Sequence, residues 1–138
     1  MLLMSKIDWK QKLGWNETHL DELRNIGYSY VRQGKYTIAL PLFEALVILD
    51  PESAYDIQTL GAIYVQINNP KNAIKALTRA LQLETDHAPT LLNLAKAFFM
   101  DKNIDEGLRL VNILKNDSNP FIAGTAAALN LTYGSKNR

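Results

Sequence analysis

The chain has 138 residues, of which 47% are hydrophobic and 21% are charged, as in an ordinary soluble globular domain with its own hydrophobic core. Its formal net charge is only +1 and no basic face is evident, so nucleic acid is not an expected partner. The absence of cysteine excludes disulfides, thiolate metal sites and cysteine nucleophiles.

The first 19 residues are predicted to form a short helix and a linker. Ile7, Trp9 and Leu13 lie on a helix expected from residue 5 to residue 13. The apolar run at the start is too short for a signal peptide, and no stretch approaches the ~20 apolar residues that span a bilayer. We therefore expect a cytoplasmic protein without membrane insertion. The short helix caps the fold or contacts a partner, and Trp9 with Trp15 leaves open a homodimer through it.

A period of 34 residues runs through the middle of the chain. Gly27, Gly61 and Ala95 lie 34 residues apart and divide this region into units of residues 20–53, 54–87 and 88–121. In a helical hairpin a small residue lets the partner backbone approach, and a bulky residue fills the space beside it. The sequence therefore predicts three stacked hairpins, with no strand pattern. The same period relates further small and bulky residues: Ala39, Ala73 and Gly107; Tyr30, Tyr64 and Phe98; Phe43, Leu77 and Val111.

Helix-start signals fall where these hairpins require them. Ser53 and Asp56 are spaced like a capping box, and an Asn-Pro pair begins two further helices, at residues 69 and 119. The last of these helices is rich in alanine and runs to about Leu131. We expect residues 122–138 to form a capping helix and tail over the end of the array. Pro41 lies inside one predicted helix, where it removes a backbone hydrogen bond and favours a mild kink.

The repeat resembles the tetratricopeptide repeat family. Unit two departs from that family with Thr85 where proline is usual, and unit three has Ala95 in place of glycine. The resemblance implies an all-α fold: a right-handed superhelical array of three helix hairpins, with a short N-terminal helix and a C-terminal capping helix. The matching residues of unit one are Leu23, Ile26, Gly27, Tyr30, Gly34, Tyr36, Ala39, Phe43 and Pro51.

A narrower resemblance is carried by the same unit. Residues 30–36 are followed by Ala39 and by residues 42–50, and together they resemble the first repeat of the class II chaperones of bacterial type III secretion. Those chaperones hold hydrophobic translocators in the cytoplasm, and related small repeat proteins chaperone other export components. The resemblance implies a protein-binding chaperone for a secreted or export-apparatus client. A generic tetratricopeptide adaptor or scaffold for protein complex assembly is the alternative.

By resemblance, the first helix of each unit lines a concave groove that holds a client peptide. Apolar residues at these positions would form one patch, with a pocket at Ala62, and an exposed apolar patch usually marks a binding site. Arg24 and Lys96 would hold carboxylates or backbone carbonyls of the partner. The competing interpretation is that several of these side chains are core residues. The expected groove residues are Arg24, Tyr28, Val31, Tyr55, Gln58, Ala62, Val65, Leu92, Lys96, Phe99 and Met100.

Signals for catalysis or cofactor binding are weak. His19 and His87 are isolated, and no spacing typical of a metal site or a phosphate loop is present. The cationic clamp that some tetratricopeptide domains use for the acidic tails of heat-shock chaperones is also not expected, because Thr59, Pro89 and Asn93 occupy clamp positions. We expect another polypeptide as the partner, with no cofactor, no metal and no enzyme activity.

Overall fold

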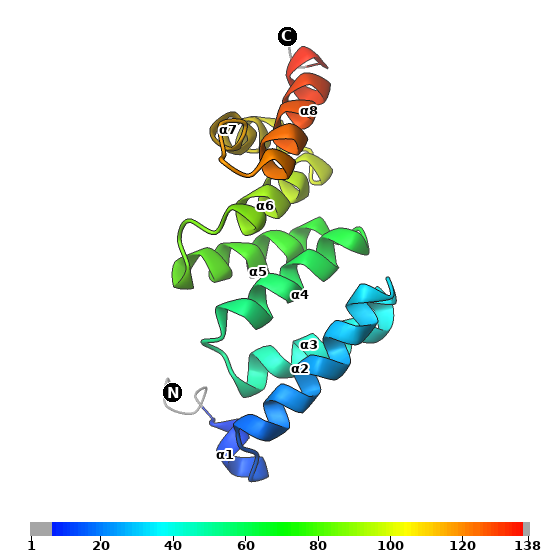
Figure 1. The fold of residues 1–138 in the computed structure, drawn as a ribbon, viewed down its shortest axis with the longest axis vertical. Coiled ribbons are helices and arrows are strands. Elements are labelled where there is room, and N and C mark those ends of the chain that lie inside the picture. Colours follow the sequence, from blue (N-terminus) through cyan, green and yellow to red (C-terminus); the bar gives the residue numbers. More distant parts are fainter. Residues whose placement is uncertain (1–6, 137–138) are drawn as a thin grey trace.

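The computed structural model describes residues 7–136 of the chain. Within this range every regular element is an α-helix, which confirms the predicted all-α class. Three hairpins stack along the long axis of the molecule, with a short helix before them and a last helix after them (Figure 1). This is the right-handed superhelical array that the tetratricopeptide resemblance implies. In chain order the helices are α1 (Trp9–Leu13), α2 (Glu17–Arg32), α3 (Tyr36–Leu49), α4 (Ala54–Gln66), α5 (Pro70–Leu83), α6 (Ala88–Met100), α7 (Ile104–Leu114) and α8 (Pro120–Lys136).

The two terminal helices differ in extent from the sequence prediction. Helix α1 begins at Trp9, where the carboxylate of Asp8 accepts a hydrogen bond from the backbone N–H of Gln11. Residues 5 and 6 of the predicted helix, and residues 137–138 of the predicted tail, lie outside the described range. Helix α8 continues to Lys136, past the predicted end near Leu131. The last helix is therefore longer, and better able to cover the end of the array.

The turn inside each hairpin repeats with the period of the sequence. Gly34, Asn68 and Lys102 have positive φ angles of 74°, 63° and 66°. In each hairpin the N–H of the next residue donates to a carbonyl oxygen in the last turn of the first helix, at N···O distances of 2.9, 2.9 and 2.8 Å. A left-handed residue at this point ends the first helix and redirects the chain. Because glycine alone adopts this conformation without strain, the turn is marked clearly in the sequence only at Gly34.

Small residues set the close approach of the two helices within a hairpin. A Cβ atom added to Gly27 would lie 2.7 Å from Cε2 of Phe43, and Gly61 meets a similar obstacle in the second hairpin. In the third hairpin the equivalent pair is Ala95 and Val111, both fully buried. Val111 is smaller than its counterparts in the first two hairpins and leaves room for the methyl group of Ala95. The close packing of the two helices is therefore preserved.

The core runs along the stack instead of forming one central cluster. One buried cluster lies between α2, α3 and α4 around Phe43, a second joins α4, α5 and α6 around Leu77, and a third joins α6, α7 and α8 around Phe99. Each hairpin packs on its neighbours, and α8 packs on α7 and α6 at the end of the stack. The accessible surface of any hairpin therefore depends on what lies next to it.

Candidate peptide-binding groove

The expected groove lies along the first helices of the three hairpins, α2, α4 and α6. Its most accessible residues are Tyr28 on α2 and Tyr55 on α4, which are 44% and 46% exposed. The accessible part of the groove is therefore concentrated on the first two hairpins. The half-buried members of the expected set are Arg24, Val31, Gln58, Ala62, Lys96 and Met100.

Tyr28 and Tyr55 belong to neighbouring hairpins and are both about half exposed. Partial burial raises the pKa of Tyr55 above its ordinary value. The guanidinium of Arg32 lies over the Tyr28 ring, 5.3 Å from the ring centroid, in a cation–π arrangement. This surface thus presents two aromatic rings with polar tips, a combination that suits the binding of apolar side chains and peptide backbone together.

Three of the expected groove residues are core residues instead. Leu92 and Phe99 are each 3% exposed, and Val65 is 9% exposed. The ring of Phe99 stacks on Tyr133 of α8 with centroids 4.1 Å apart, and Leu92 belongs to the same buried cluster. Val65 packs in the cluster between the second and third hairpins. The expectation of one exposed apolar patch over all three hairpins is therefore wrong, because α8 and the hairpin contacts cover part of it.

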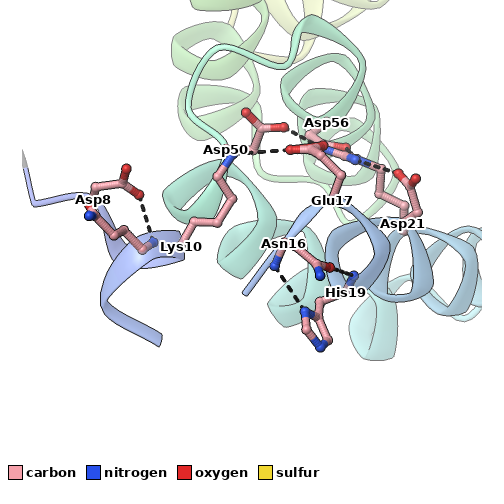
Figure 2. A network of polar contacts seen from close by, with 10 residues as sticks. Asp8, Lys10, Asn16, Glu17, His19, Asp21, Asp50 and Asp56 are labelled. Carbon is pink, nitrogen blue, oxygen red and sulfur yellow. Dashed lines mark hydrogen bonds and ion pairs between the residues drawn. The ribbon is translucent and has the colours of Figure 1, made fainter. Parts of the chain in front are cut away.

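Arg24 is engaged within the protein. Its Nε donates to both carboxylate oxygens of Asp56, at 2.8 and 3.0 Å, and its Nη2 donates to Asp56 and Asp50, at 2.8 and 2.7 Å. Its Nη1 donates to Asp21 at 3.0 Å. Figure 2 shows the three carboxylates converging from α2, from the end of α3 and from α4. The expectation that Arg24 is free to hold a carboxylate of a partner is therefore not met.

Sequence reasoning assigned Asp56 only to a helix start. That role exists, because the Ser53 hydroxyl accepts a hydrogen bond from the Asp56 N–H at 3.3 Å. The carboxylate, however, is completely buried and binds Arg24 across the boundary between hairpins. The only available signal was an acidic residue in the first turn of α4, 32 residues after an arginine of α2.

Two neighbouring hollows lie away from the expected groove, along α3 and α5. The first, of about 600 Å³, lies between the start of α1 and the end of α3, and the second, of about 560 Å³, lies between α3, α4 and α5. Val47, Pro51 and Arg79 line both hollows, so the two share part of their walls. Tyr64 in the second hollow donates to Glu44 at 2.9 Å, and burial together with this hydrogen bond raises the pKa of Tyr64 to about 12. No periodic signal marked this groove, because its walls come from two hairpins.

The histidines make ordinary contacts at helix starts. Nδ1 of His19 accepts a hydrogen bond from the backbone N–H of Asn16 at 3.0 Å, and Nδ1 of His87 lies 2.7 Å from Oγ1 of Thr90. Among the described residues, no group of three His, Cys, Asp or Glu side chains is placed to hold a metal ion. Across residues 7–136, no helix combines the length and apolar character needed to cross a membrane.

The family comparison matches most of the repeat region. A protein-family model described as the anaphase-promoting complex, cyclosome, subunit 3, matches residues 17–112, which run from the start of α2 into α7. No curated protein sequence matches the chain significantly.

Solved structures share the fold at low sequence identity. PcrH, a protein of Pseudomonas aeruginosa, in complex with the chaperone-binding region of PopD is 18% identical, with a TM-score of 0.76 over 91% of this chain and 98% of that chain. The type III secretion chaperone SycD of Yersinia enterocolitica, in complex with a peptide of the translocator YopD, is 16% identical, with a TM-score of 0.77 over 88% of this chain and 96% of that chain. The first TPR of Spaghetti (RPAP3), bound to the HSP90 peptide SRMEEVD, is 17% identical, with a TM-score of 0.74. The match covers 86% of this chain and 96% of that chain.

Proposed function

Because the chain belongs to the tetratricopeptide-type family described as the anaphase-promoting complex, cyclosome, subunit 3, we propose that it is a protein-binding chaperone that holds a client segment along α2 and α4. The observation that carries this proposal is the pair of half-exposed tyrosines, Tyr28 and Tyr55, on the first helices of neighbouring hairpins. Ala62 lies about two turns beyond Tyr55 on the same helix, where its small side chain would let a client side chain enter.

Binding uses apolar burial and backbone hydrogen bonds together. An apolar client side chain that enters beside Ala62 loses on the order of 100 Å² of exposed surface, which favours binding by about 2.5 kcal/mol. The two tyrosine hydroxyls could donate to, and accept from, the backbone of an extended client. Lys96 on α6, and Gln58 on α4, whose amide donates to Glu84 at 3.0 Å, would supply polar groups at the edge of this contact.

The finer part of the proposal is the client class. We place the chain with chaperones of type III secretion, which bind a translocator or another export component in the cytoplasm. Support comes from the fold shared with PcrH and SycD, whose structures hold a region of PopD and a peptide of YopD. A homodimer through α1 belongs to the same proposal, because Trp9 is 40% exposed and Leu13 is 54% exposed.

The alternative function is a generic adaptor that assembles folded proteins. The fold shared with the first TPR of RPAP3, which binds a short acidic peptide, supports this alternative. A clamp for such a peptide needs several free cations, but Arg24 is already paired with three carboxylates. An adaptor role would therefore use another recognition mode.

Affinity purification from the native host tests the proposal. The native chain, Ala62→Glu and the matched control Thr78→Glu, at an exposed site on α5, are compared by mass spectrometry of what they retain. We expect one hydrophobic secreted protein with the native chain and the control, and its loss with Ala62→Glu. Retention of the same partners by Ala62→Glu would reject the groove, and recovery of stable folded partners would favour the adaptor.

A further inference from the structure

We propose that the second hollow, between α3, α4 and α5, binds an acidic amphipathic helix of another protein, with apolar side chains beside a row of carboxylates. The hollow has a volume of about 560 Å³, within the range of about 300–1,000 Å³ that is usual for ligand pockets. It lies apart from the tyrosine surface on α2 and α4, so this proposal does not depend on the proposed client site.

The wall of the hollow is largely apolar. Ile57 and Leu60 of α4, which are 5% and 7% exposed, line it together with Val47 of α3 and Ala76 of α5. An apolar side chain that enters the hollow removes its own surface and part of this wall from water, which favours binding. The wall therefore selects an apolar side chain of the partner.

The rim of the hollow carries positive charge. Lys75 and Arg79 of α5 are both exposed and line the hollow, and Lys71 lies one turn before Lys75. Residues four apart lie on one face of a helix, so the three cations form a row. Among the described residues, no carboxylate lines this hollow, and neither Lys75 nor Arg79 forms an ion pair. Carboxylates of a partner would complement this rim.

Acidic side chains near the rim do not neutralise it. Glu44 accepts a hydrogen bond from a tyrosine hydroxyl of α4, at 2.9 Å, and does not line the hollow. Arg79 also lines the first hollow, which carries three carboxylates, but its guanidinium donates to a backbone carbonyl oxygen at 3.3 Å. Lys75 lines the second hollow and not the first. Lys75 is therefore the residue on which the charge argument is best tested.

Helix α5 gains little from these cations by itself. Its sequence contains no aspartate or glutamate, so no pair within the helix offsets the repulsion between like charges four residues apart. Lys71 lies in the first turn, where a positive charge opposes the helix macrodipole. Its side chain is 83% exposed, so its ion pair with Asp101 contributes little. A row of cations that does not stabilise its own helix favours a partner of opposite charge.

The spacing of the cations defines the partner segment. Four residues of helix rise about 6 Å, so carboxylates four residues apart on a partner helix match the separation of Lys75 and Arg79 along α5. Apolar side chains on the adjoining strip of such a helix would enter the hollow, as in other complexes of a helix in a groove. The aliphatic stems of Lys75 and Arg79 would cover them, while the charged ends meet the carboxylates.

The hollow and the proposed client surface lie on opposite faces of α4. At about 100° per residue, Ile57, Leu60 and Tyr64 fall roughly 140–200° around the helix from Tyr55, whereas Ala62 falls within about 20° of it. A client along α2 and α4 therefore leaves the hollow open. The chain would then hold a client on one face and an acidic partner on the other.

Fluorescence anisotropy with designed peptides tests the proposal on the full chain. The probe is a labelled helical peptide of about 20 residues, with leucines along one strip and glutamates four residues apart beside them. One comparison peptide has glutamine for glutamate, and the other has alanine for leucine. We expect each to bind on the order of tenfold more weakly than the probe, because one loses the ion pairs and the other the apolar burial. Equal affinity of the probe and either comparison peptide would reject the proposal.

Variants of the chain assign the binding to the hollow. Lys75→Glu reverses a rim charge, and Ala76→Trp fills the hollow without a change of charge. Both should weaken binding of the probe on the order of tenfold, while circular dichroism shows that the helices persist. The control Lys35→Glu makes the same charge change at an exposed site about 18 Å along α3 from Val47. It should leave binding unchanged.

The client site provides the remaining comparison. Ala62→Glu alters the opposite face of α4, so it should bind the probe as tightly as the native chain does. Loss of the probe with Ala62→Glu would place the peptide in the client groove and overturn the proposal. Full binding by Lys75→Glu, or by Ala76→Trp, would overturn it as well, and neither result would bear on the client site.

Discussion

Arg24 and Asp56 join the first hairpin to the second by three hydrogen bonds of 2.8 to 3.0 Å. The carboxylate of Asp56 is completely buried, and the side chain of Arg24 is 17% exposed. Asp50 and Asp21 complete the surroundings of the guanidinium. The angle between the first two hairpins, and so the spacing of Tyr28 and Tyr55, is therefore held by a buried ion pair as well as by apolar packing.

Removal of one partner from this pair should destabilise the protein strongly. Arg24→Met leaves the carboxylate of Asp56 buried and unpaired, which is expected to lower the free energy of unfolding by about 3–5 kcal/mol. Urea denaturation measures the change. The double variant Arg24→Met with Asp56→Leu should recover most of the loss, because the buried charge is gone. The control Lys10→Met breaks the exposed pair with Glu17 and should cost less than about 1 kcal/mol.

The close approach of α4 and α5 should make Gly61 sensitive to a single methyl group. A Cβ atom at this position would overlap the side chain of Leu77, so Gly61→Ala is expected to cost about 1–3 kcal/mol. Adding Leu77→Val reproduces the Ala95 and Val111 pair of the third hairpin and should restore part of the loss. Gly124→Ala is the control, because nothing lies within 4 Å of the added atom. It should stabilise α8 by up to about 1 kcal/mol.

Because Phe99 is a core residue, its substitution should affect stability, whereas substitution of the exposed Tyr28 should affect client binding. Phe99→Ala should lower the free energy of unfolding by about 3–5 kcal/mol, because it leaves a cavity beside Tyr133. Tyr28→Ala removes an exposed side chain, so it should change stability by only about 0.5 kcal/mol while reducing capture of the client. Thermal unfolding and affinity purification of both variants check this. A stable Phe99→Ala protein that loses its client would instead make Phe99 a binding residue.

The hydrogen bond from Tyr64 to Glu44 should be visible as a pH dependence of stability. Burial, followed by this hydrogen bond, raises the pKa of Tyr64 from 10.0 to about 12 in the folded protein. Between these pH values the folded chain keeps a proton that the unfolded chain loses, so the stability is complete below about pH 10 and is lost as the pH rises toward about 12. Tyr64→Phe should flatten the fall in the free energy of unfolding across this window, as measured by urea denaturation. An unchanged slope would contradict the assignment.

Much of the fold could be predicted because each hairpin obeys local rules. Gly27 and Gly61 mark the close approach, and Gly34 marks the left-handed turn. The prediction of exposure was less successful. Leu92 and Phe99 occupy the same repeat positions as residues that line an open groove in the resemblance, but here α8 lies against them. Periodicity assigns a residue to a face of its helix, and it does not show whether another helix covers that face.

The sequence by itself determined the three hairpins, their order and the small residues that let their helices meet, because these features depend on residues close together in the chain or related by one fixed period. Only the tertiary structure decided that Arg24 pairs with the buried Asp56, that Phe99 stacks on Tyr133, and that hollows lie along α3 and α5. Those features depend on how one hairpin is rotated against the next, and that rotation results from the packing of many side chains at once.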